Sequence, residues 1–155
     1  MSGKDIIFRL ATRADLPSIV RMLADDDLGS QRERYEDPLP GSYYTAFEQI
    51  SNNPNHELIA AELNGEVIGT LQLMFLPSIS FQGRLRAQIE SVRVDKKFQS
   101  RGIGSEMMKW TIKRASERGA HVVQLTTHQS RKAAHRFYER LGFKASHLGM
   151  KLSLK

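Results

Sequence analysis

The spacing of hydrophobic positions predicts short strands and amphipathic helices in alternation along the chain. An apolar run at residues 6–10 predicts a strand, and a set of apolar residues at helical spacing then predicts a helix to about residue 24: Leu16, Ile19, Val20 and Leu23. Thr12, followed three residues later by Asp15, is typical of a helix N-terminus. Residues 29–41 are polar and contain two prolines, which predicts a loop, and a second short helix is expected around residues 43–50.

The middle of the chain predicts an antiparallel meander. Apolar runs at residues 58–63 and 67–75 flank Asn64-Gly65. Asn-Gly between two strands favours a type I′ hairpin turn, because both turn positions need a positive φ. Residues 77–83 predict another connection, and residues 84–94 the next strand.

The last third of the chain predicts a strand–helix–strand unit and then a short helix. A helix is expected from residue 103 to about Arg118-Gly119, where glycine favours a helix end, and residues 121–127 (HVVQLTT) are typical of a buried strand. This unit should be a right-handed parallel crossover. A short helix over residues 134–141 and a final strand or strand pair at 143–145 and 150–154 complete a single α/β domain over residues 1–155.

Composition narrows the class of protein. The 155 residues are 40% hydrophobic and 26% charged, as in an ordinary globular domain. With no cysteine, disulfides, thiolate metal sites and cysteine nucleophiles are excluded. The first ten residues lack the apolar region of a secretory signal, and no apolar run approaches the roughly 18 residues that span a bilayer. We therefore expect a cytoplasmic protein without a membrane partner.

The net charge of +6 and the pI near 9.8 favour polyanionic ligands. Lysine and arginine are spread along the chain rather than gathered in a run, which disfavours nucleic acid as the partner. Some of this charge could instead hold a phosphorylated small molecule.

The stretch from Ile89 to Ile112 carries the clearest chemical signal. A strand leads through a polar turn with two glycines, Gly102 and Gly104, directly into a helix. Glycine lets the backbone approach a ligand closely, and the free amides and dipole of a helix N-terminus favour an anion. This pattern predicts a phosphate site. A dinucleotide fingerprint would need a third glycine, and no Walker lysine follows, so both nucleotide interpretations are disfavoured.

Two motifs resemble the GCN5-related N-acetyltransferase (GNAT) superfamily. Val92-x-Val94 followed by Gln99-x-x-Gly102-x-Gly104 resembles its acetyl-CoA site, and residues 134–143 (AHRFYERLGF) are similar to its A-x-x-F-Y-E-x-L-G-F signature. The resemblance covers residues 84–144. It implies a mixed, mainly antiparallel sheet of six to seven strands with about four helices and a splayed central strand pair.

The resemblance also implies where acetyl-CoA, the cosubstrate, binds. Its pantetheine arm would pair with the backbone of the splayed strand, and its pyrophosphate would meet the glycine turn. The implied cofactor-binding residues are Val92, Arg93, Val94, Gln99, Ser100, Arg101, Gly102, Ile103, Gly104, Ser105, Arg131 and Ala134. At the position of Arg131 many members have an asparagine. Arg131 or Lys132 could therefore engage a cofactor phosphate, with a solvated helix start as the alternative.

Acyl transfer to an amine needs a base for the amine, an acid for the leaving thiolate and a donor for the oxyanion. The resemblance assigns the acid to Tyr138, whose alternative role is packing, and the oxyanion donor to the amide of Val92. Glu90 is the first candidate for the base, with a solvated or ion-paired carboxylate as the alternative. His128 is the second candidate, since the pKa of histidine lies near neutrality; a water chain is the third.

The chain is thus predicted to acetylate a primary amine of a small molecule directly from acetyl-CoA. A peptide or protein amine, an acyl-CoA sensor and a DNA-binding regulator are the alternatives. A short similarity to aminoalkylphosphonate N-acetyltransferases near residues 131–147 implies an anionic amine, which Arg84 or Arg86 could meet. That subgroup can involve a divalent metal, but no ligand cluster with a defining spacing is present. A homodimer through the final strand at 150–154 is left open.

Overall fold

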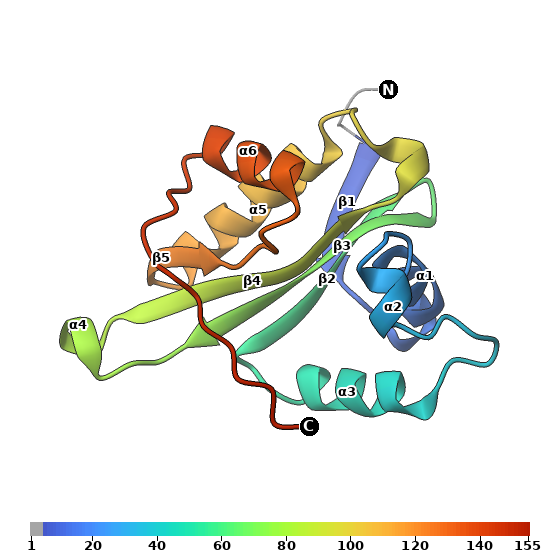
Figure 1. Cartoon of the computed structure of the whole chain (residues 1–155), viewed down its shortest axis with the longest axis horizontal. Helices are drawn as coiled ribbons and strands as arrows, with labels where there is room; N and C mark the ends of the chain where they lie inside the picture. The colour runs from blue at the N-terminus through green and yellow to red at the C-terminus, as the bar shows by residue number, and fades with distance from the viewer. Residues whose placement is uncertain (1–4) are drawn as a thin grey trace.

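The computed structural model of the chain describes residues 5–155 (Figure 1). Residues 1–4, part of the N-terminal stretch for which no secretory signal is predicted, lie outside the described residues. The strands are β1 (Ile6–Leu10), β2 (His56–Leu63), β3 (Glu66–Leu76), β4 (Leu85–Val94) and β5 (Ala120–Leu125). The helices are α1 (Leu16–Leu23), α2 (Gly29–Arg32), α3 (Gly41–Ser51), α4 (Ser80–Gly83), α5 (Ile103–Glu117) and α6 (Lys132–Arg140), with 3₁₀ turns η2 (Arg13–Asp15) and η3 (Lys96–Phe98).

One sheet, in the strand order β1-β2-β3-β4-β5, organises the described residues. The first four strands are antiparallel neighbours, as the meander predicts, and β4 pairs with β5 in parallel through the α5 crossover. Asn64 and Gly65 turn β2 into β3 with φ values of 49° and 82°, which confirms the predicted hairpin. The expectation of a mixed, mainly antiparallel α/β fold is confirmed.

Helices cover both faces of this sheet. Figure 1 shows α5 and α6 on one face and α1 and α2 on the other. The main core cluster joins the sheet to Met107 and Met108 of α5, and a smaller cluster joins it to Ile19 of α1. Because the central strands face apolar side chains on both sides, residues 59–61 of β2 are buried without alternation.

An ion pair fixes the far half of α5 on the sheet. Arg114 donates from Nε and Nη2 to the two carboxylate oxygens of Glu57 on β2, at 2.5 and 2.6 Å, and Arg118 adds a third contact at 3.4 Å. Glu57 is buried, so its charge needs these partners. The N-terminus of α5, at the other end of the helix, follows the loop that leaves β4.

The predicted numbers of strands and helices are wrong. The described residues contain five strands and six helical segments rather than six or seven strands and about four helices. The expected loop at 29–41 begins with the short helix α2, and the connection at 77–83 contains α4. Two residues of α4, Phe81 and Gln82, have φ values of 54° and 61°, so this segment is a left-handed turn rather than a regular helix.

The missing strands are the ones predicted at 143–145 and 150–154. The C-terminal arm, residues 146–154, carries four apolar side chains that alternate with other residues and are 86–92% exposed: Leu148, Met150, Leu152 and Leu154. Alternation predicts an extended conformation but not a partner, and a strand needs one for its backbone groups. Figure 1 shows the arm running past the sheet toward α3.

In the part of the chain that the structure describes, every helix is too short or too polar to cross a membrane.

Candidate functional site

A β-bulge in β4 sets the geometry of the site. The pairing register between β3 and β4 shifts so that Ser91 and Val92 together face the single residue Leu71, and Ser91 has a φ of 57°. Beyond the bulge, the face of each residue is reversed. Ile89, Val92 and Val94 therefore all contact the main core cluster, although their spacing is not that of a regular strand.

Just before the bulge, β4 and β5 separate. Their pairing ends at Ile89, so among the described residues no strand pairs with residues 90–94 of β4 on that side. The carbonyl of Val92 accepts from Nη1 of Arg93 at 2.9 Å, and that of Val94 accepts from Nε2 of Gln99 at 3.1 Å. Because the N–H and C=O of one strand residue point the same way, the amide of Val92 also faces this open edge. The splayed strand pair implied by the resemblance is confirmed.

The loop after β4 is fixed at its first residue, Asp95. The amide of Asp95 donates to the carbonyl of Ile68 at 2.8 Å. Its buried carboxylate accepts from the amide of Lys97 at 3.0 Å and from Nη2 of Arg21 at 2.7 Å. Burial acts to raise the pKa of Asp95, but these two interactions outweigh it and hold the pKa below its ordinary value. These contacts attach the start of the loop to β3 and to α1.

The loop delivers an uncapped helix N-terminus. Gly102 is the N-cap of α5, has a φ of 78°, and provides no side chain to cap the first amides. These amides, at residues 103–105, have no partner within the helix. A Cβ built on Gly104 would lie 3.5 Å from Phe137 and 3.6 Å from Val94, so the first turn of α5 packs closely on β4 and α6.

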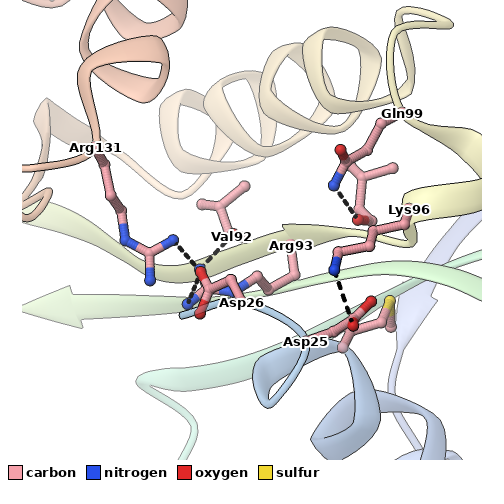
Figure 2. Close-up of a pocket in the computed structure, with 9 residues that line it drawn as sticks. Asp25, Asp26, Val92, Arg93, Lys96, Gln99 and Arg131 are labelled. Carbon is pink, nitrogen blue, oxygen red and sulfur yellow. Dashed lines mark hydrogen bonds and ion pairs between the residues drawn. The ribbon is translucent and has the colours of Figure 1, made fainter. Parts of the chain in front are cut away.

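A cavity of about 320 Å³ lies beside this strand end (Figure 2). It is lined by Met22, Asp25, Asp26, Val92, Arg93, Val94, Lys96, Gln99 and Arg131. Five of the predicted cofactor residues meet here, at positions 92–94, 99 and 131. The predicted residues at 100–105 and 134 are not in its lining.

Asp26 is a site residue that the sequence did not single out, because it lies in the polar stretch just after the predicted end of the first helix. Its Oδ2 accepts from Nη1 of Arg131 at 2.5 Å and lies 3.9 Å from Nη2 of Arg93. Figure 2 shows Arg131 reaching over β4 to meet it. Burial acts to raise the pKa of Asp26, but the hydrogen bonds from Gly29 and Arg131 outweigh burial and hold the pKa below its ordinary value. The carboxylate is therefore charged at neutral pH.

One carboxylate does not saturate two guanidinium groups. Among the described residues, three buried side-chain nitrogens have no hydrogen-bond acceptor: Nε of Arg86 at the start of β4, and Nε of Arg93 and Nη2 of Arg131 at this cluster. An unsatisfied buried donor costs about 1–3 kcal/mol. Burial is the main cause that lowers the pKa of Arg93, and the charge of Arg131 adds to it, whereas the charge of Asp26 acts in the opposite direction.

Tyr138 lies on α6, the helix whose N-cap is Arg131. Its ring packs edge-on against Phe137 and Phe143, with centroid distances of 5.2 and 5.9 Å. Burial raises the pKa of Tyr138, and the charges of Arg93 and Arg131 act in the opposite direction, which places both arginines near the phenol. A phenol with a raised pKa keeps its proton at neutral pH and is able to donate it.

The two candidates for the base lie on different elements. Glu90 is exposed on β4 just before the bulge, and its Oε1 accepts from Gln88 at 2.8 Å. His128 is exposed after β5, where its Nδ1 is 2.8 Å from the hydroxyl of Ser130. Neither contacts Tyr138 in the structure, so both assignments stay predictions.

The predicted anion residues Arg84 and Arg86 lie at the start of β4. Arg86 lies six positions before Val92, which is about 20 Å along a strand. They are thus far from the cavity.

Comparison with known proteins gives a consistent result. Residues 21–143 match the acetyltransferase (GNAT) family. The chain is 33% identical over 95 residues to an aminoalkylphosphonate N-acetyltransferase of Salmonella typhimurium (61% of each protein) and 31% identical over 90 residues to a glucosamine 6-phosphate N-acetyltransferase of Trypanosoma brucei brucei (58% of this chain and 59% of that protein). These alignments span about three-fifths of the length of the curated relatives.

A crystal structure described as a transcriptional regulator from Bacillus halodurans has the same fold. It shares 51% identity with this chain at a TM-score of 0.93, and the match covers 96% of this chain and 99% of that one.

Proposed function

From the premise that this chain belongs to the acetyltransferase (GNAT) family and is an N-acetyltransferase, we propose that it transfers an acetyl group directly from acetyl-CoA to a primary amine of a small molecule. Two backbone features that follow each other along the chain support this proposal: the open edge of β4 at residues 92–94 and the uncapped N-terminus of α5.

These two features suit the two halves of coenzyme A. The open edge offers backbone donors and acceptors at which an amide-containing arm pairs like an added strand. In the structure two of its carbonyls, those of Val92 and Val94, are held by the side chains of Arg93 and Gln99, which an arriving arm would displace. The free amides of α5 and the open space beside Gly102 suit the pyrophosphate.

The acyl-transfer roles then fall to three groups around the bulge. The thioester supplies the activated acetyl group. The amide of Val92 faces the open edge and is positioned to donate to the developing oxyanion. Tyr138 holds a proton for the leaving thiolate, and Glu90, two residues before Val92, is the nearest carboxylate on β4 for the amine proton.

A small acceptor is favoured over a peptide by two observations. Both curated relatives are named for amines of small molecules. The aromatic side chains of Tyr43 and Tyr44 on α3, which a peptide site would use for packing, are already engaged within the chain: the hydroxyl of Tyr43 donates to Glu33 at 2.9 Å, and Arg13 lies 4.2 Å above the ring of Tyr44.

The test is an amine panel with thiol release as the readout and product mass as confirmation. We expect acetyl-CoA turnover with small primary amines and little with peptides. Turnover restricted to peptides would show that the acceptor is a peptide amine rather than a small-molecule amine. Binding of acetyl-CoA without turnover of any amine would leave a sensor and overturn the transfer proposal.

A DNA-binding regulator is the second candidate. The name of the 51% identical protein and the net charge of +6 favour it. Titration of duplex DNA at several salt concentrations separates the two, since weak binding that vanishes at physiological salt is only nonspecific.

A further inference from the structure

Two arginines beside the open edge of β4 share a single carboxylate. The side chains of Arg93 and Arg131 are 17% and 25% exposed, and both face Asp26. The charge of Arg32 also acts on Arg93. The cluster therefore has more positive than negative charge in a partly desolvated place, where a second anion would be stabilised.

Asp26 is already engaged at both of its carboxylate oxygens. Its Oδ1 accepts from the amide of Gly29 at 2.6 Å, and its Oδ2 already takes Nη1 of Arg131. The loop that carries it is tightly packed, because a Cβ on Gly29 would lie 1.9 Å from the carbonyl of Leu23. Asp26 is thus a fixed positioning residue that holds the guanidinium groups in place, and Nε of Arg93 and Nη2 of Arg131 still lack a partner.

The position of the cluster identifies which anion it suits. It lies at the bulge, next to Val92 and within the field of Tyr138, where the acyl transfer is proposed to take place. The amides of α5 that suit the pyrophosphate lie further along the chain, beyond Gln99. Nη1 of Arg93 donates to the carbonyl of Val92 at 2.9 Å, so its guanidinium lies directly beside the residue whose amide is proposed to donate to the oxyanion.

We propose that Arg93 and Arg131 bind an acidic group of the acceptor, a phosphonate, phosphate or carboxylate joined to the primary amine by a short spacer. This inference rests on the proposed function and adds its substrate class. A planar guanidinium fork pairs with two oxygens of such a group at once, which orients the amine as well as binding it.

Three amines of similar length test the proposal: 2-aminoethylphosphonate, 3-aminopropanoate, and propylamine, which has no acidic group. We expect the wild-type protein to prefer the acidic amines by about tenfold to a hundredfold in kcat/KM. Arg93→Gln should remove most of this preference through KM. Arg93→Lys, which keeps the charge but not the fork, should retain an intermediate preference. Arg140→Gln removes one charge from an exposed site on α6 and should leave the preference unchanged.

A second measurement distinguishes the acceptor from the cofactor as the source of the anion. Inorganic phosphate should compete with the amine and not with acetyl-CoA, and Arg93→Gln should weaken phosphate binding while acetyl-CoA affinity changes by less than about twofold. Loss of acetyl-CoA affinity in Arg93→Gln would assign the cluster to the cofactor and overturn the proposal.

The proposed function and this inference fail in different ways. Equal turnover of the two acidic amines and of propylamine would refute the anion site while leaving the N-acetyltransferase proposal intact. Acetyl-CoA binding without turnover of any amine would refute the transfer proposal; phosphate binding that is insensitive to Arg93→Gln would then refute the anion site independently.

Discussion

Replacing Gly102 by aspartate tests whether the N-terminus of α5 binds the pyrophosphate of coenzyme A. Gly102 has a φ of 78°, and a Cβ built on it meets no atom within 4 Å. Gly65 in the β2–β3 hairpin is a matched control, with a φ of 82° and equally open space. Aspartate at either position carries the strain of a positive φ, about 1 kcal/mol. At Gly102, the N-cap of α5, aspartate also gains a capping interaction, so the comparison is made on the ligand-induced shift and not on the stability of the free variants.

Only the change at Gly102 places a negative charge where the phosphate is expected. At a separation of about 6 Å and an effective dielectric constant of about 40, one carboxylate repels one phosphate charge by about 1.4 kcal/mol, which is tenfold in Kd. Acetyl-CoA at 100 times the wild-type Kd stabilises the folded state by about 2.7 kcal/mol, and a tenfold weaker Kd reduces this to about 1.4 kcal/mol.

Thermal unfolding with and without acetyl-CoA measures this difference. For a chain of this length the lost stabilisation corresponds to about 3–5 °C of ligand-induced shift in Tm. The shift should be smaller in Gly102→Asp and unchanged in Gly65→Asp, and added salt should narrow the difference. Equal shifts in both variants would refute the assignment of the pyrophosphate to α5.

Three further changes test other parts of the structure. Tyr138→Phe should lower kcat about a hundredfold with acetyl-CoA affinity kept, whereas Tyr35→Phe at an exposed position should not; an unchanged rate would remove Tyr138 from the mechanism. Because folding lowers the pKa of Asp95, its carboxylate stabilises the folded state at pH values above the ordinary pKa of 3.8, and this stabilisation is lost as the pH falls through the folded pKa. Asp95→Asn should therefore make the unfolding free energy fall less steeply with decreasing pH in the acid range. Equal slopes for the wild type and the variant would contradict this. We also propose that the C-terminal arm pairs with the free edge of β5 in a second copy. Light scattering should then give twice 17.6 kDa, reduced to the monomer mass by Leu152→Asp; a monomeric wild type would exclude this.

Local patterns predicted the hairpin, the crossover unit and the α5 start because each depends on neighbouring residues. Asn64-Gly65 specifies its own turn, and Gly102 its own left-handed φ. The count of strands could not be obtained in this way, since alternation in the C-terminal arm describes one chain segment and pairing requires two. The cluster at Asp26 is equally non-local, because it joins residues 105 positions apart.

The bulge in β4 lies between these cases. Its residue at positive φ is Ser91, which carries no local signal for that conformation. Yet the apolar residues Ile89, Val92 and Val94 break the period of two, and an odd step in an otherwise regular strand is what one extra residue produces. The same extra residue opens the strand edge at Val92 and turns Arg93 toward Asp26. The defect in the pattern therefore accounts for both halves of the proposed site, the backbone that suits the cofactor and the guanidinium that suits the acceptor.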